Sequence, residues 1–83
     1  MIPRVGKKMR ACVHYVCAHP GATVAETADA IATLRETSYY TRRSSGAAVV
    51  LRCAAAGLIN RAGSRRLYRL HATQLGWALN MQL

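Results

Sequence analysis

A helix stop and a helix start stand next to each other early in the chain. His19, Pro20 and Gly21 form the stop, because proline lacks the amide that a helix interior needs and glycine tolerates the turn that follows. Residues 23–26 form the start, since the hydroxyl of Thr23 can accept from the third helical amide while the side chain of Glu26 reaches back. The sequence therefore predicts two separate helices on either side of residues 19–22.

The spacing of apolar residues gives the first two helices their extent. In the first, which is predicted to begin at Lys7, the apolar residues Met9, Val13 and Val16 recur every three or four positions, as on one face of a helix. The second helix is predicted to end between residues 31 and 34.

A third helix is predicted over about residues 45–56. Ser44 or Ser45 would be its N-cap, because serine accepts hydrogen bonds from free helix amides. Gly57 stands where a C-terminal helix glycine belongs. Residues 37–46, which are polar, aromatic and basic and end at Gly46, are interpreted as a turn that leads into this helix.

The pattern changes after residue 57. Residues 58–70 predict a two-stranded hairpin with a loop that contains Gly63 and Ser64, and Tyr68 and Leu70 would share one face of it. A last short helix, capped by Thr73, is predicted to run through residue 79.

The charge balance narrows the functional classes. The chain has 83 residues, with 12 Lys and Arg against 3 Asp and Glu, for a formal net charge of +9. This length suits one small domain, and the positive charge favours nucleic acid as the partner. An anionic membrane surface is the rival, although no apolar run is long enough to span a bilayer. Glu26, Asp29 and Glu36 fall in one short segment, which argues against paired-carboxylate catalysis, so neither an enzyme nor a cofactor is expected.

The cysteines favour a reducing compartment. Cys12, Cys17 and Cys53 are odd in number and form no C-x-x-C motif, so they are interpreted as small core residues. A cytoplasmic location is expected, with nucleoid association if the source is bacterial or phage. A zinc site at His14, Cys17 and His19 is the disfavoured alternative, because zinc sites usually show two paired half-sites.

In this order, these elements resemble the winged helix-turn-helix domains of small phage and bacterial transcription regulators and excisionase-like proteins. The resemblance is carried by the capped helix at residues 23–31, by Val50, Cys53 and the run 57–59, and by the basic hairpin that closes on residues 68–70. It implies an α+β, mainly α fold with a three-helix core, a two-stranded hairpin called the wing, and a short C-terminal helix. The domain would cover residues 7–79, between a flexible arm at 1–6 and an apolar tail at 80–83.

The resemblance also implies where nucleic acid would bind. In this family the third helix typically enters the major groove and the wing touches backbone or minor groove. Arg42 and Arg43 would precede the helix N-terminus, where phosphate binds free amides. The matching helix residues are Arg42, Arg43, Ser44, Ser45, Ala48 and Arg52, the wing residues are Arg61, Ser64, Arg65, Arg66 and Arg69, and further phosphate contacts are predicted at Lys7, Lys8, Arg10 and Tyr40.

The end of the chain predicts a second interface. Residues 70–83 contain no Lys, Arg, Asp or Glu, so the apolar side chains there are predicted to be buried against this domain or against a second copy in a homodimer. These side chains are Trp77, Leu79, Met81 and Leu83.

The sequence is therefore interpreted as a double-stranded DNA-binding protein, a transcriptional regulator, with no small-molecule substrate evident. Two alternatives stay open: a winged-helix module that binds an acidic protein, and an RNA-binding domain. Single-stranded RNA is less favoured, because its readers usually gather several aromatic side chains on one platform.

Overall fold

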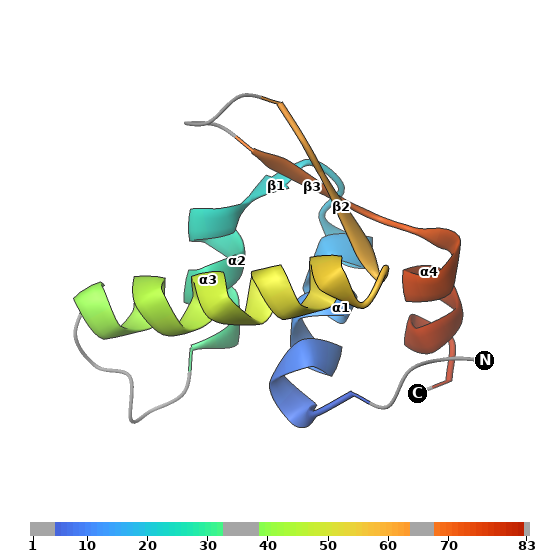
Figure 1. Ribbon diagram of the computed structural model, residues 1–83, viewed down its shortest axis with the longest axis horizontal. Coiled ribbons are helices and arrows are strands. Elements are labelled where there is room, and N and C mark those ends of the chain that lie inside the picture. The colour runs from blue at the N-terminus through green and yellow to red at the C-terminus, as the bar shows by residue number, and fades with distance from the viewer. Residues whose placement is uncertain (1–4, 33–38, 64–67, 83) are drawn as a thin grey trace.

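The computed structural model describes residues 5–32, 39–63 and 68–82, without the side chains of residues 39–42. Figure 1 shows α3 lying across α1 and α2, with the strands above them and α4 at one end. In chain order the elements are α1 (Lys7–Ala18), β1 (Ala22–Thr23), α2 (Val24–Ile31), α3 (Tyr39–Ala55), β2 (Ile59–Ala62), β3 (Arg69–Ala72) and α4 (Gln74–Asn80).

The predicted end of α1 and the predicted start of α2 are both confirmed. The backbone amide of His19 donates to the carbonyl of Tyr15 at 2.9 Å where α1 ends, and Gly21 has a φ of 86°. The amide of Glu26 donates to Thr23 Oγ1 and the amide of Thr23 donates to Glu26 Oε1, each at 3.1 Å, so the capping box is confirmed. These contacts fix the direction in which the chain leaves α1 and enters α2.

The prediction for the start of α3 was wrong. The helix begins at Tyr39, so Ser44 and Ser45 lie inside it and neither is its N-cap. Gly46, next to the two serines, suggested a turn, but it is a buried helical residue whose added Cβ would overlap Ala28 of α2. Glycine is present at this position because α2 and α3 approach each other closely. The helix can begin before the serines because arginine, which occupies positions 42 and 43, is a good helix former.

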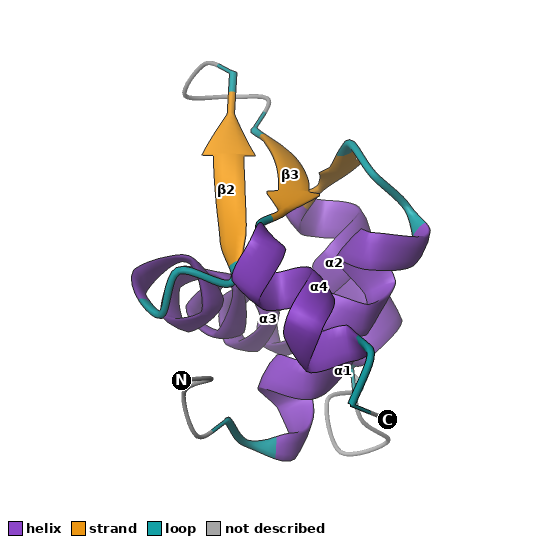
Figure 2. Cartoon of the chain, turned by 90° about the vertical axis from the view of Figure 1, so that its right-hand side faces the viewer, coloured by secondary structure: helices purple, strands orange, loops and turns teal. Residues whose placement is uncertain are grey.

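The sheet has one strand more than predicted. The hairpin of β2 and β3 is present, and β1 pairs antiparallel with β3, which gives the order β1-β3-β2. Ala22 lies opposite Leu70 in this pairing, and the amide of Gly21 donates to the carbonyl of Leu70 at 2.9 Å. A two-residue strand is too short to show the alternation that marks strands in a sequence. Figure 2 shows the hairpin rising from the helices as a wing.

One apolar core joins all four described helices to the sheet. Val13, Val50, Leu58 and Leu70 are among its most buried members. The three cysteines belong to it too, as interpreted: Cys12, Cys17 and Cys53. With three helices around this core, a hairpin wing and a short C-terminal helix, the predicted winged helix-turn-helix fold is confirmed.

Val5, two residues before the predicted start of the domain, packs against the core. Residues 1–4 of the predicted arm lie outside the described chain. At the other end, His14 Nδ1 donates to Asn80 Oδ1 at 3.0 Å, which ties the end of α4 to α1. None of the helices in the described ranges has the length and apolar character to cross a membrane.

Candidate nucleic-acid interface

One side of α3 faces solvent along several turns. Among residues 43–55 of this helix, whose side chains the structure describes, the buried ones are Gly46, Val49, Val50 and Cys53. The exposed residues on the opposite side recur every three or four positions, which places them along one line of the helix. We call this line the outer face of α3, and it consists of Ser44, Ala48, Leu51 and Ala55.

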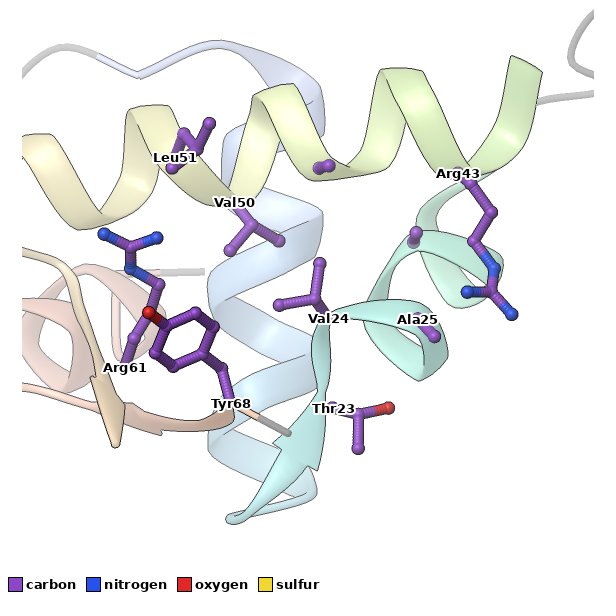
Figure 3. A pocket seen from close by; sticks show the side chains of 10 residues that line it. Thr23, Val24, Ala25, Arg43, Val50, Leu51, Arg61 and Tyr68 are labelled. Carbon is purple, nitrogen blue, oxygen red and sulfur yellow. The ribbon is translucent and has the colours of Figure 1, made fainter. Parts of the chain in front are cut away.

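A hollow of about 450 Å³ adjoins the outer face, between α3, the start of α2 and the hairpin. We call it the hairpin hollow. In Figure 3, Arg43 stands at one end of it and Arg61 with Tyr68 at the other, with Val24 and Val50 between them. The hollow therefore has an apolar floor and a cation at each end.

The position of Arg61 follows from strand alternation. Ile59, two residues earlier on the same face of β2, is fully buried, and Arg61 continues this face beyond the end of the core. Its guanidinium carbon lies 5.2 Å from the centroid of the Tyr68 ring. A cation over an aromatic face is attracted to it, so the guanidinium is held at the mouth of the hollow.

Arg69 lies on the opposite face of the hairpin and has a different environment. One of its guanidinium nitrogens donates to the carbonyl of Gly21 at 3.1 Å, just before α2. Hydrogen bonds from the backbone and hydroxyl of Thr23 lower the pKa of Glu26, and the charge of Arg69 adds a smaller effect in the same direction. Arg69 is thus held beside the capped start of α2.

Two of the predicted contact residues of α3, Ser45 and Arg52, lie on the side of the helix that faces α1. Lys8 Nζ donates to Ser45 Oγ at 3.1 Å, so Ser45 faces α1 and does not belong to the outer face of α3. Arg52 is exposed and lies seven residues after Ser45, which places it on the same side of the helix, two turns along. Lys7 and Arg10 are exposed at the start of α1. Figure 1 shows that end of α1 on the opposite side of the domain from the hairpin.

The argument that placed Arg42 and Arg43 before a helix N-terminus was wrong. Both residues lie inside α3, which begins at Tyr39, so their amides are not the free amides of a helix start. Arg43 instead lines the hairpin hollow. The remaining predicted contacts lie outside the described side chains: Tyr40, Arg42, Ser64, Arg65 and Arg66.

The apolar residues at the C-terminus divide into two groups. Leu79 is 2% exposed and belongs to the core of its own domain, which is the first of the two predicted alternatives. Trp77 is 46% exposed and Met81 is 81% exposed, so these side chains remain at the surface. Leu83 lies outside the described residues.

Two histidines of the zinc site considered above, His14 and His19, contact other side chains of the domain. His19 stacks on Tyr15, with ring centroids 4.4 Å apart, and His14 bonds to Asn80. Across residues 5–32, 39–63 and 68–82, no three side chains of His, Cys, Asp and Glu come together in a group that could hold a metal ion.

Leu51 and Val24 line the hairpin hollow and were not among the site residues predicted from the sequence. Leu51 directly follows Val50 and is out of phase with the buried positions Val50 and Cys53. This phase difference, at the helical period, is the signal that could have placed Leu51 on the outside.

Comparison with solved structures supports the fold. The chain is similar to the crystal structure of the multiple antibiotic-resistance repressor (MarR) from Listeria monocytogenes 4b F2365, with a TM-score of 0.75 and 23% sequence identity. The match covers 94% of this chain and 48% of that chain, so this chain spans about half the length of its neighbour. No family model and no curated protein sequence matches the chain. The likeness shows that the described elements have the winged helix-turn-helix fold, which the sequence had predicted.

Proposed function

We propose that this protein binds double-stranded DNA, with the outer face of α3 in the major groove and the hairpin on the backbone or in the minor groove. The net charge of +9 supports a polyanionic partner. The fold supports the mode of binding, since a helix-turn-helix motif presents its second helix to the major groove. In this chain α2 and α3 form the motif, so that helix is α3.

The observation that carries this proposal is the position of arginines on both sides of the outer face of α3. Arg43 and Arg61 line the hairpin hollow on one side. Arg52 lies on the other side, toward α1. The major groove is about 12 Å wide and admits one α-helix, with a phosphate backbone along each border. A helix seated in the groove would therefore bring these arginines to both backbones.

The same geometry favours DNA over duplex RNA. The major groove of A-form RNA is too deep and narrow for protein side chains to read. An α-helix with cations on both sides matches the wide major groove of B-form DNA instead. Lys7 and Arg10, at the far end of α1, are left out of this proposed interface.

We propose a regulatory rather than an excisionase-like role. The solved neighbour is described as a repressor, and this chain has the same fold. We also propose that the protein acts as a homodimer in the cytoplasm. Trp77 and Met81 would form the surface between the two copies, because they are the large apolar side chains that α4 and the residue after it expose.

Binding measurements with matched nucleic acids test the proposal. A labelled random-sequence DNA duplex, the same sequence pool as duplex RNA, and single-stranded RNA would each be titrated with the full chain at several salt concentrations. Three arginines on phosphates give a slope of log K against log salt concentration of about −3, and further contacts make it steeper. Preference for the DNA duplex with this slope is expected.

Three results would contradict the proposal. A slope near zero would exclude binding through phosphates. Absence of binding to any of the three nucleic acids would favour the module that binds an acidic protein. Stronger binding to either RNA would favour the RNA-binding alternative.

A further inference from the structure

The outer face of α3 carries mostly apolar side chains, whereas a helix that recognises a DNA sequence usually carries side chains that form hydrogen bonds with base edges. Ser44 is polar, but Ala48, Leu51 and Ala55 carry only methyl and methylene groups. Leu51 is 53% exposed, which makes it one of three large hydrophobic residues at the surface of the described chain. The other two, Trp77 and Met81, lie on or just after α4.

The surroundings of Leu51 indicate what would cover it. Leu51 borders the hairpin hollow, which has Arg43 and Arg61 at its two ends. The apolar side chain thus lies between two positively charged side chains, in a chain whose formal net charge is +9. The partner therefore combines dense negative charge with an exposed apolar group. In the major groove of DNA, the C5 methyl of thymine is that apolar group, and it lies between two phosphate backbones.

We propose that α3 reads thymine methyl groups, with Leu51 and Ala48 as the specificity-determining residues. This inference rests on the DNA binding proposed above and adds how the sequence is recognised. Leu51 and Ala48 are three residues apart, or about 4.5 Å along the helix axis. Neighbouring bases of one strand rise by roughly 3.4 Å. The two side chains are therefore spaced to contact the methyl groups of adjacent or nearly adjacent thymines.

The expected preference is moderate for each contact. Removing one methyl-sized group from water changes affinity by about fourfold. Two contacted thymines would thus separate a preferred site from its methyl-free counterpart by about an order of magnitude. The phosphate contacts contribute to both sites equally, because they carry no sequence information.

Replacing thymine by uracil tests the proposal. Uracil pairs with adenine and keeps every phosphate and every hydrogen-bonding group of thymine, and lacks only the C5 methyl. Sequences would be selected by the full chain from a random duplex pool and then resynthesised with deoxyuridine in place of thymidine. We expect about a tenfold loss of affinity for the selected sequences and no change for the unselected pool.

Variants at Leu51 test whether this residue causes the preference for thymine over uracil. Leu51→Ala is expected to lower the ratio of thymine-duplex to uracil-duplex affinity from about ten to about four, because the contact of Ala48 remains, and Leu51→Met is expected to preserve the ratio. Gln74→Ala, an exposed and uncharged position on α4, is the control and should change neither affinity nor ratio. Circular dichroism would verify that each variant is folded.

The outcomes separate this inference from the proposed function. Salt-dependent binding of selected thymine and uracil duplexes with equal affinity would overturn methyl recognition and leave DNA binding in place. Selection that enriches no sequence would do the same. Retention of neither pool would overturn both proposals. An unchanged affinity ratio in Leu51→Ala would overturn the role of Leu51.

Discussion

The guanidinium of Arg61 lies over the ring of Tyr68, with 5.2 Å between the guanidinium carbon and the ring centroid. Both residues belong to the hairpin segment and both line the hairpin hollow. The contact holds a cation beside α3 before any partner is bound. Fewer conformations of the arginine are then lost on binding, which is the usual benefit of a pre-positioned side chain.

Arg61→Ala is expected to weaken DNA binding for all sequences alike. Loss of one phosphate contact should make the salt slope shallower by about one. Arg10→Ala is the matched control, because it removes the same charge at the far end of α1 and should leave the slope nearly unchanged. Fluorescence anisotropy over a salt series measures both. Equal effects of the two variants would mean that net charge alone drives binding.

Tyr68→Leu tests the pre-positioning directly. The variant keeps Arg61 and its charge but removes the aromatic face beneath the guanidinium. We expect a smaller loss of affinity than in Arg61→Ala and an unchanged salt slope, since the phosphate contact can still form. A salt slope reduced as far as in Arg61→Ala would show that Arg61 makes no contact without the ring.

Gly46→Ala is expected to destabilise the fold although alanine is the better helix former. The new Cβ would overlap Ala28 on α2, and overpacking of this kind costs about 1–3 kcal/mol. The gain in helix propensity offsets only about 1 kcal/mol of this. Urea denaturation measures the difference in the free energy of unfolding.

Two further variants complete the test at Gly46. The double variant Gly46→Ala with Ala28→Gly should recover at most part of the lost stability, because it removes the methyl of Ala28 but leaves the Cα of that residue 2.5 Å from the new Cβ. Gly6→Ala is the control, since a Cβ there meets no atom within 4 Å. A Gly46→Ala variant as stable as the unmodified chain would contradict the close approach of α2 and α3.

Stability should depend on the ionisation of Glu26. Hydrogen bonds from Thr23 lower the pKa of this carboxyl from its ordinary value of 4.5. A group whose pKa is lower in the folded state stabilises the fold at pH values above its unfolded pKa. This contribution is therefore fully present above about pH 4.5 and is lost as the pH falls through the lower, folded value.

Glu26→Gln measures that contribution. The free energy of unfolding, followed between pH 3 and pH 7, should fall less steeply on acidification in the variant than in the unmodified chain. Asp29→Asn, on the same helix, is the control for the loss of one negative charge. Identical profiles for Glu26→Gln and the unmodified chain would show that the capping box is insensitive to charge.

The exposed apolar residues near the C-terminus predict self-association. The double variant Trp77→Ser with Met81→Ser should be monomeric at protein concentrations where the unmodified chain is a dimer, as measured by sedimentation equilibrium. Gln74→Ala, on the same helix, should leave the association constant unchanged. An unmodified chain that stays monomeric up to high concentration would contradict the predicted homodimer.

Much of the fold could be predicted from the sequence because its boundaries depend on local contacts. The capping box of Thr23 and Glu26 and the helix end at His19 each involve hydrogen bonds between residues three or four apart. Thr73 likewise accepts the amide of Gly76, three residues later. Such contacts are determined by neighbouring residue types, so the sequence alone determined α1, α2, the hairpin and α4.

The tertiary structure decided the features whose causes lie far apart in the chain. Gly46 could be a turn residue or a helix contact, and Ala28 on another helix makes it the latter. Strand β1 exists because Leu70 offers it backbone partners. The candidate interface depends on folding in the same way, since Arg43 and Arg61 meet at one hollow only when the hairpin packs beside α3. A pattern of nearby residues carries no information on such pairings, because their energy comes from groups that folding alone brings together.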